Sequence, residues 1–567
     1  MRKNKRFVCL PVALIIALNI LVYANTFKVP FLFDDVRYIE NNKIILEPLD
    51  INALIKTYFL RGIVRWSYAV NYLIGELNTI GYHIVNLFLH IIVSILIFVI
   101  LRSLYPNRKW NLPLLAALLF SLHPIQIESV TYLMSRSGLL AAFFYLLAFY
   151  FFINSIRNFP AHAVKTIIFS IATLICFFLG LGSKLTIVSL PIMLIIYLLV
   201  ININKISLLH AARKYKWLLM GVLTVFAFFL IHKSFSRHGL LGVSGMAIEQ
   251  YGRWGYFMTE VKAFYFYYLK LLFFPINLNI NPDFPFLPSL WQTICLLILT
   301  LLGLFYSVKH LKKFPLLIFS IFWILITLSP TSSIVPLNDL VAEHRIYLPS
   351  LGFFIAISLA IVEPKRLSET VKTVSVLTMV IVFSTLTVQR NSVWNDSISI
   401  WEDAVKKSPH HVKSHINAGR SYYHGRMLKK AAASYKKANK INAFYFEPHY
   451  NLGTIYYEWG NLDKAAKEFS ISLQLKKLPE TYINLGKIYM DKKKYDASIN
   501  MFKAAIHLQR DCSVCFRYIA IIYYYYLRDY KKAKFYFQQT LKLDPEQNQK
   551  QEIQSIIDSL DTSLTVR

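Results

Sequence analysis

The stretch HIVNLFLHIIVSILIFVIL, residues 83–101, decides the fold class of this chain. It contains no Asp, Glu, Lys or Arg. A helix of about twenty apolar residues crosses the hydrocarbon core of a bilayer, and within a single segment only a helix pairs all of its own backbone groups there. The stretch therefore predicts a membrane-spanning helix.

Similar apolar runs recur up to about Arg390. The 567-residue chain is 56% apolar and 15% aromatic, above the roughly 45–50% apolar content of soluble proteins. Leu112–Leu122 is short and needs residues on either side to span. The eleven predicted spans are Phe7–Tyr23, His83–Leu101, Leu112–Leu122, Gly138–Ile153, Lys165–Leu181, Val188–Ile203, Trp217–Ile231, Ser289–Tyr306, Pro315–Leu328, Tyr347–Val362 and Val371–Val388.

The basic residues predict the orientation. The formal net charge of +31 raises the question of nucleic-acid binding, but Lys and Arg gather in cytoplasmic loops for topological reasons. With the N-terminus in the cytoplasm, all five cytoplasmic loops are basic, provided that Glu260–Pro275 is an interfacial or re-entrant helix. The first span follows Arg2 and Lys3 without a small-residue cleavage site, so we expect a retained signal anchor. An odd number of spans puts the C-terminal region outside the cytoplasm.

That C-terminal region repeats itself with a period near 34 residues, from about Ser408 to Pro545. This period and its small and aromatic positions predict tetratricopeptide (TPR) repeats, in which paired helices stack into a solenoid. The small position holds Gly419, Gly453, Gly486 and Ala520, and three residues on stand Tyr422, Tyr456, Tyr489 and Tyr523. The second helices carry Ala431/Tyr435, Ala465/Phe469, Ala497/Phe502 and Ala533/Phe537.

The predicted class is therefore all-α: a polytopic helical bundle followed by an α-solenoid. The predicted domains are residues 1–390 in the membrane, a junction with half a repeat at 391–409, about four repeats at 410–545, and a capping helix and tail at 546–567. Cys512 and Cys515 form a lone CxxC without a second pair, so zinc is not expected. A local disulfide and two free thiols both stay open.

Four polar clusters lie on the predicted outer face. They are Asp34-Asp35, the block from His123 through Glu128 to Arg136, Ser183-Lys184, and Glu343-His344-Arg345. Carboxylates beside Lys, Arg and His at a bilayer surface suit a phosphate-containing lipid, because the cations hold phosphate while a carboxylate takes a proton. The acidic pair Asp34 and Asp35 also leaves open a divalent cation such as Mg²⁺ or Mn²⁺.

These clusters resemble those of a known family. Phe-Asp-Asp at 33–35, the block HPIQIESVTYLMSRSGLLAAFFYLLA from His123, the Ser-Lys at 183–184 and AEHRIYLPSLGFF from Ala342 are similar to the transmembrane and TPR repeat-containing protein O-mannosyltransferases. Those proteins are similar to the wider GT-C glycosyltransferases. The resemblance covers essentially the whole chain, with departures at Leu185, where an acidic residue is expected, and at Trp66, where a proline is expected.

The resemblance implies transfer of a sugar, mannose or a similar hexose, from a polyprenyl-phosphate carrier to a hydroxyl group, such as that of a protein Ser or Thr. It implies that Asp34 or Asp35 is the catalytic carboxylate and that Lys184, His344 and Arg345 contact the donor phosphate. We add Arg136 to these cations. The supporting residues are His123, Glu128, Glu343 and Arg65.

The expected partners are the lipid-linked sugar, the bilayer and a protein that the repeats bind, with no nucleic acid. The expected location is a bacterial inner membrane. Two alternatives stay open: a lipid-linked-oligosaccharide ligase or polymerase, and a membrane-anchored TPR scaffold without enzymatic activity.

Overall fold

A computed structural model describes residues 2–46, 61–105, 111–159, 161–201, 252–286, 288–332, 337, 339–545 and 549–565. The described residues form helices and connecting turns and contain no strand. Contacts divide the chain into two compact units, Met1–Lys407 and Ser408–Arg567. Each unit is described by itself below. The all-α class predicted from the sequence is confirmed.

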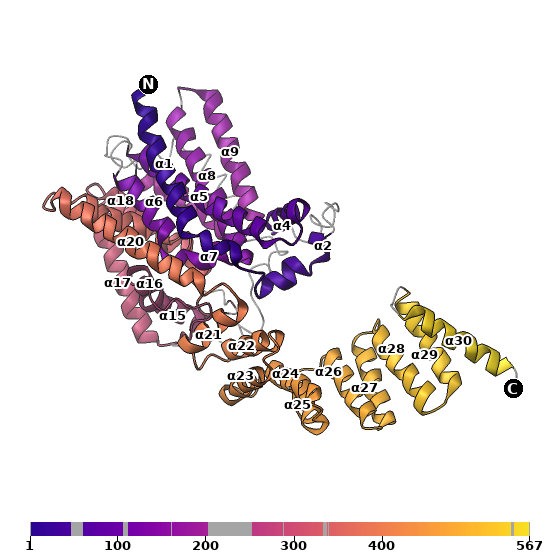
Figure 1. Cartoon of the computed structure of the whole chain (residues 1–567). Helices are drawn as coiled ribbons and strands as arrows, with labels where there is room; N and C mark the ends of the chain where they lie inside the picture. Colours follow the sequence, from indigo (N-terminus) through magenta and orange to yellow (C-terminus); the bar gives the residue numbers. More distant parts are fainter. Residues whose placement is uncertain are drawn as a thin grey trace. The chain divides into compact units, whose positions relative to one another are not determined.

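Helices build the first unit, and Figure 1 labels most of them. Short 3₁₀ and π turns connect several of them. The α-helices are α1 (Arg2–Val22), α2 (Lys43–Leu46), α4 (Gly62–Gly75), α5 (Thr79–Leu104), α6 (Asn111–Leu122), α7 (Ile127–Thr131), α8 (Arg136–Asn158), α9 (Ala163–Leu181), α10 (Leu190–Val200), α15 (Arg253–Ala263), α16 (Leu269–Phe273), α17 (Leu290–Lys309), α18 (Pro315–Leu328), α19 (Ser350–Val362), α20 (Glu369–Ser392) and α21 (Ser397–Lys407).

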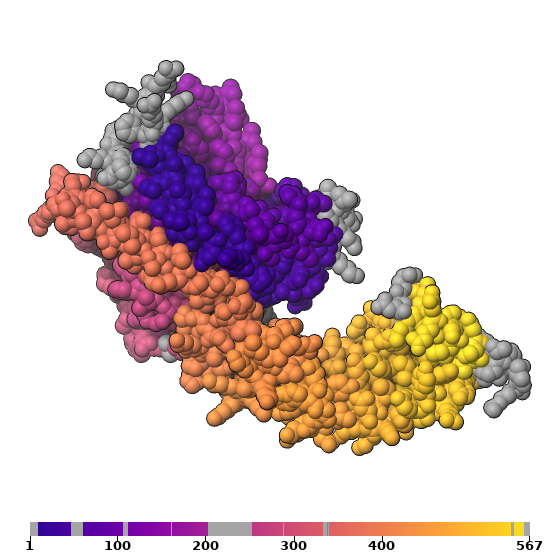
Figure 2. All heavy atoms as spheres, in the orientation of Figure 1, coloured from indigo at the N-terminus to yellow at the C-terminus, as the bar shows by residue number. Residues whose placement is uncertain are grey.

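The core of this unit lies where α5, α6, α8, α18 and α19 pack together. By contrast, α17 and α20 keep apolar side chains such as Leu302 and Ile381 largely exposed, and Figure 2 shows α20 on the outer surface of the unit. A helix with an exposed apolar face suits contact with lipid. The first unit is therefore a membrane helical bundle.

Every predicted span within the described residues coincides with an apolar helix, and Trp217–Ile231 lies outside those residues. Five described helices are long and apolar enough to cross a membrane, or six if the bent pair Leu112–Leu122 and Pro124–Thr131 is one span. Four shorter apolar helices are Cys9–Val22, Leu185–Val200, Pro315–Leu328 and Ser350–Val362. The segment Glu260–Pro275 is not among these candidates. The count of eleven spans stays a prediction.

The second unit consists of helix pairs that pack in sequence order, as Figure 1 shows from α22 to α30. A last helix packs against α29 and buries Ile553 and Ile557. The helices are α22 (Val412–His424), α23 (Leu428–Ile441), α24 (Phe446–Glu458), α25 (Leu462–Leu475), α26 (Pro479–Asp491), α27 (Tyr495–Leu508), α28 (Ser513–Ile521), α29 (Tyr530–Leu543) and α30 (Lys550–Thr565).

The small residues of the repeats lie against aromatic rings of the paired helices, as the repeat pattern predicts. A Cβ atom built on Gly453 would lie 2.9 Å from the ring of Phe469 on the following helix, closer than a methyl group and a ring can approach. In the third repeat the prediction of Ala497 is wrong. Ser498 occupies the position four residues before Phe502, is buried, and donates to the Gly486 carbonyl at 2.6 Å. A hydroxyl that finds a backbone acceptor can replace alanine there.

Candidate functional site

The acidic pair Asp34-Asp35 divides into one exposed and one buried carboxylate. Asp34 is exposed, whereas Asp35 is 1% exposed. The Asp35 carboxylate accepts hydrogen bonds from the backbone N–H of Leu32 at 3.0 Å and of Met134 at 2.9 Å. Asp35 therefore ties its own loop to the turn before α8, and Asp34 is the member of the pair that a substrate can reach.

Phe33 fixes the backbone just before this pair. Its φ of +51° lies in the left-handed region, which is uncommon for a bulky residue. Its ring packs edge-on against Trp401 at 4.8 Å and Tyr132 at 5.8 Å between centroids. This aromatic packing holds the turn that directs Asp34 outward and Asp35 inward. Burial raises the pKa of Asp35 to about 8, although the two backbone donors and Arg136 lower it.

Arg136, predicted to contact the donor phosphate, is fully buried at the start of α8. Its guanidinium donates to Asn86 Oδ1 at 2.7 Å and Asn71 Oδ1 at 2.7 Å, and it lies 4.5 Å from the centroid of the Tyr68 ring. It also donates to the carbonyls of Ser67 and Tyr82. All of these hydrogen-bond acceptors belong to the protein. Arg136 therefore links α4, α5 and α8 and does not face a ligand.

Glu128 and His344 meet across a separation of 216 residues. His344 Nδ1 lies 2.6 Å from Glu128 Oε1, and the backbone N–H of His344 donates to Oε2 at 3.1 Å. The His344 side chain is 34% exposed, against 6% for Glu128. Glu128 therefore orients the imidazole through Nδ1, and Nε2 remains for a ligand. His123, in contrast, is buried between the rings of Phe354 and Phe383.

Arg345 points away from His344 and into the protein. Its guanidinium contacts Glu260 Oε1 at 3.2 Å and Tyr256 at 3.2 Å, and it donates to the carbonyls of Leu340 and Asp339. Arg345 is 7% exposed. The sequence pattern did not indicate Glu260 as its partner, although a charged residue in an apolar segment is a signal for a buried ion pair. Burial raises the pKa of Glu260, and Arg345 lowers it.

Glu343 has different partners from those of His344 and Arg345. Its Oε1 accepts from the backbone N–H of Asn279 at 2.5 Å, and Tyr267 Oη lies 3.5 Å away. Burial raises the pKa of Glu343 to about 8, although Arg390 and Lys407 lower it. The three consecutive charged residues from Glu343 to Arg345 thus have separate partners, and only His344 keeps substantial exposure.

Lys184 is half-buried in the loop after α9. Burial, together with the positive charges of Arg61 and Arg345, lowers its pKa to about 8, although Glu128 acts in the opposite direction. Arg65 lies on α4 one helical turn after Arg61, with its backbone N–H bonded to the Arg61 carbonyl. Leu185 begins the 3₁₀ turn that follows Lys184. Glu128 and Arg61 are thus among the charged groups that act on Lys184, and the contact of Lys184 with the donor phosphate stays a prediction.

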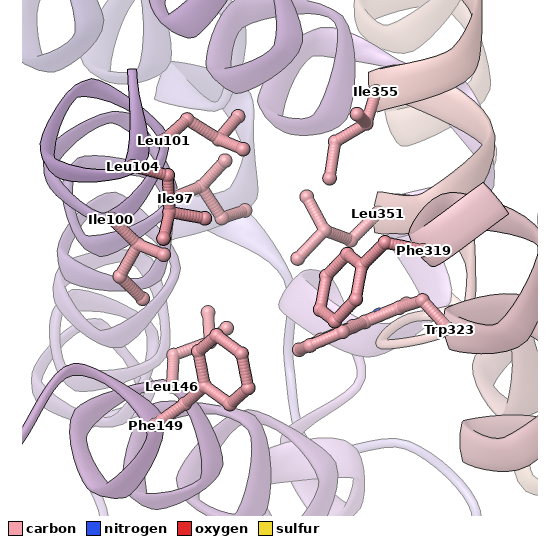
Figure 3. Close-up of a pocket in the computed structure, with 10 residues that line it drawn as sticks. All are labelled: Ile97, Ile100, Leu101, Leu104, Leu146, Phe149, Phe319, Trp323, Leu351 and Ile355. Atoms are coloured by element: carbon pink, nitrogen blue, oxygen red, sulfur yellow. The ribbon is translucent and has the colours of Figure 1, made fainter. Parts of the chain in front are cut away.

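Among the described residues, no three His, Cys, Asp or Glu side chains are placed to hold a metal ion. We therefore derive no step through a cation at Asp34 and Asp35. Figure 3 shows a cavity of about 20 Å³ in the core, with apolar side chains from α5, α8, α18 and α19 pointing into it. This volume is near that of one water molecule. It reflects packing in the bundle and is too small for a substrate.

Sequence comparison finds relatives that are named protein O-mannosyl-transferases. A protein O-mannosyl-transferase of Caenorhabditis elegans is 24% identical over 457 residues, which are 76% of this chain and 63% of that protein. A protein O-mannosyl-transferase of Homo sapiens is 25% identical over 482 residues, which are 71% of this chain and 62% of that protein. This chain is similar to the protein O-mannosyl-transferases. The resemblance predicted from its motifs is confirmed.

These O-mannosyl-transferases are longer than this chain, which spans about three fifths of their length. The tetratricopeptide repeat family matches residues 479–512 and 520–547, which cover the third and fourth predicted repeats. The crystal structure of MamA protein is 21% identical, with a TM-score of 0.25, and its match covers 26% of this chain and 81% of that one.

Proposed function

We propose that this protein transfers a sugar, mannose or a similar hexose, from a polyprenyl-phosphate carrier to a hydroxyl group of a protein on the extracytoplasmic face of the membrane. The observation that carries the proposal is the exposed Asp34 carboxylate on a loop that Asp35 and Phe33 hold in place. The names of the relatives support the reaction class, and the apolar helices support the lipid carrier.

In this mechanism Asp34 accepts the proton of the acceptor hydroxyl as its oxygen attacks the anomeric carbon. The bond between that carbon and the phosphate oxygen breaks, and the phosphate leaves with the electron pair. His344 and Lys184 stabilise the charge that develops on the leaving phosphate. Glu128 positions His344, because it accepts from both the ring and the backbone of that residue.

Arg136 and Arg345 take a different role in this proposal from the one that their sequence positions predict. Both guanidinium groups are buried among protein acceptors. We assign them to positioning: Arg136 holds the turn before α8, and Arg345 holds the loop that carries His344. Asp35 positions Asp34 in the same way.

The second unit is proposed to lie outside the cytoplasm and to bind the acceptor protein. Cys512 and Cys515 form a disulfide, and disulfides persist in oxidising compartments outside the cytoplasm. Reporter fusions test this placement. Fusions after Asn41 and Arg567 should report the outer side, and a fusion after Lys313 should report the cytoplasm. A cytoplasmic C-terminus would separate the repeats from the site and would contradict the proposal.

Mass spectrometry of extracytoplasmic proteins tests the reaction. Cells that carry the gene should hold hexose-modified Ser or Thr peptides that are missing when the gene is deleted. Wild-type protein should restore them, and Asp34→Asn at equal abundance should not. Identical glycopeptides with and without the gene would overturn the transferase proposal and would favour a scaffold.

A further inference from the structure

One edge of the second unit is formed by the four turns that join the first helix of each repeat to the second. We call this edge the turn edge and define it as residues 424–430, 458–464, 491–497 and 525–531. Contacts at or next to these turns join each repeat to the following one, so the edge is continuous. The contacts are a hydrogen bond from Tyr423 to Glu458, a hydrogen bond of 2.8 Å from Tyr457 to Asp491, and the stacked rings of Tyr495 and Tyr526, whose centroids lie 4.7 Å apart.

The backbone takes the same left-handed conformation in all four turns. The φ angle is +57° at Arg426, +73° at Gly460, +57° at Lys493 and +54° at Arg528. Glycine adopts this region freely, whereas a residue with a Cβ atom adopts it rarely. Three of the four turns nevertheless carry a cation at this position. The turn geometry does not account for that choice, because glycine serves in the second repeat.

The turn edge is distinguished by its positive charge. Its segments hold nine Lys and Arg against five Asp and Glu, whereas the turns between successive repeats, residues 441–447, 475–481 and 508–514, hold three of each. Exposed apolar side chains occur on both edges, since Phe444 is 84% exposed. Those of the turn edge are mostly Trp and Tyr. Its exposed large side chains are Met427, Trp459, Tyr525, Tyr526, Leu527 and Tyr530.

Most of the acidic side chains on the turn edge already have partners in the protein. Glu458 and Asp491 accept from the two tyrosines, Asp463 pairs with Lys492, and Asp529 caps α29. Within the described part of the second unit, four exposed cations of this edge form no ion pair. They are Lys493, Lys494, Arg528 and Lys531. Their charge is therefore available to an anion outside the chain.

A membrane surface matches this combination of side chains. Trp and Tyr lie at the headgroup level of a bilayer, and Lys and Arg beside them meet anionic lipids. A row of turns at the ends of helices forms a ridge, which suits a flat partner, whereas a peptide needs a groove. The chain also keeps the repeats near a bilayer. The candidate span α20 ends at Ser392, and the second unit begins at Ser408.

The sixteen residues of chain from Ser392 to Ser408 reach at most about 60 Å. A tether of this kind gives the turn edge a high effective concentration at the membrane surface, so that weak individual contacts suffice for docking.

We propose that the turn edge docks the repeats on the bilayer by binding anionic phospholipid headgroups. Lys493, Lys494 and Arg528 meet the lipid phosphates, and the rings of Trp459 and Tyr526 enter the interface between headgroups and acyl chains. The remaining faces of the repeats stay open to a protein partner. This inference goes beyond the proposed function and does not depend on sugar transfer.

Hydrogen–deuterium exchange tests the docking on the full-length protein. The protein is placed in nanodiscs of phosphatidylcholine alone, or of phosphatidylcholine and phosphatidylglycerol in equal parts. Backbone amides of the turn edge should exchange more slowly in the nanodiscs that contain phosphatidylglycerol. Amides of the turns between successive repeats, residues 441–447, 475–481 and 508–514, should exchange equally in both.

A double variant, Lys493→Gln with Lys494→Gln, removes two cations of the turn edge. Each cation near an anionic surface changes the ratio of docked to free repeats by roughly fivefold, so the double variant should lose most of the protection, also at residues 525–531. The matched control is Lys477→Gln with Arg510→Gln, which removes two exposed cations from the opposite edge and should keep the protection. Thermal unfolding shows whether each variant is folded.

Equal exchange of the wild-type turn edge in the two nanodiscs would overturn the docking, whether or not the protein transfers sugar. Full protection in the folded double variant would overturn it as well. Poly-glutamate added to phosphatidylcholine nanodiscs is the last arm. If it protects the turn edge and phosphatidylglycerol does not, the edge binds an acidic protein and the assignment to a lipid surface is wrong.

Discussion

The two units of this chain differ in whether their charged side chains are buried. In the first unit Asp35, Arg136, Glu260, Glu343 and Arg345 are buried, and each has specific partners. In the described part of the second unit, no Asp, Glu, Lys or Arg is buried; its buried polar residues are Ser, Thr and His. Buried charges hold particular loops in place at a cost in stability, whereas surface charges remain available to a partner.

Under the proposed function, the bundle carries the chemistry and the repeats bind the acceptor protein. The bundle uses buried charges to orient the exposed Asp34 and the half-exposed His344. The repeats use a glycine and an aromatic ring for packing, and their charged side chains stay on the surface. Four pairs of variants test this comparison, beginning with the largest expected effect.

Asp34→Asn should lower transfer by about 10²–10⁴-fold, the range for loss of a general base, and should leave thermal stability unchanged because the side chain is exposed. Asp35→Asn should instead lower stability, since an amide cannot accept from both backbone donors. Glu40→Gln in the same loop is the matched control. Transfer at the wild-type rate in Asp34→Asn would end the proposed mechanism.

Arg345→Ala should lower the free energy of unfolding by about 3–5 kcal/mol, because it leaves the buried Glu260 carboxylate without its partner. Arg426→Ala in the repeats is the control. Its side chain is 82% exposed and lies 4.0 Å from Glu458, so the change should be at most about 1 kcal/mol. Denaturant unfolding in detergent measures both. If the Arg345→Ala variant were as stable as the wild type but did not bind the donor, Arg345 would instead be assigned to the phosphate site.

Gly453→Ala should destabilise the repeats by about 1–3 kcal/mol, because the added methyl group meets the Phe469 ring. Gly303→Ala on α17 is the counterpart in the bundle. No atom lies within 4 Å of a Cβ built there, so this variant should be neutral or slightly stabilising. Limited proteolysis of the repeats follows the first variant. Equal protection of Gly453→Ala and wild type would show that the helices can separate without loss.

The smallest effect is expected for Tyr457→Phe, which removes an exposed hydrogen bond of 2.8 Å to Asp491. The change should stay within about 0.5 kcal/mol. The same substitution in the bundle, Tyr68→Phe, removes a buried hydrogen bond of 2.6 Å to the Leu133 carbonyl and should lower stability by about 1–3 kcal/mol. Equal effects in the two units would remove the contrast between them.

Much of the architecture could be predicted from local pattern. The apolar runs predicted the helices of the bundle, and the 34-residue period predicted helix pairs with glycine opposite an aromatic ring. The shift from Ala497 to Ser498 shows the limit of this approach. A one-residue choice between two small side chains depends on which of them faces the neighbouring helix, and Ser498 is the one that bonds to the Gly486 carbonyl.

The candidate site was predictable as a set of residues but not as an arrangement. Asp34, Glu128, Lys184 and His344 could be selected because charged and polar side chains beside apolar spans are unusual. The sequence could not predict which way these side chains point or which residues they contact. The partner of His344 is 216 residues away in sequence, and Arg345 is bonded to Glu260, 85 residues away.

The sequence by itself determined the helical class, the apolar helices and the repeats, because hydrophobic periodicity and the glycine and aromatic positions act within one helix or between neighbouring helices. Only the tertiary structure decided which of Asp34 and Asp35 is exposed, and which cations are already bonded to protein. These outcomes depend on backbone turns such as that at Phe33 and on contacts between distant loops. A side chain's chemistry is encoded locally, but its direction and its partners follow from how the whole unit packs.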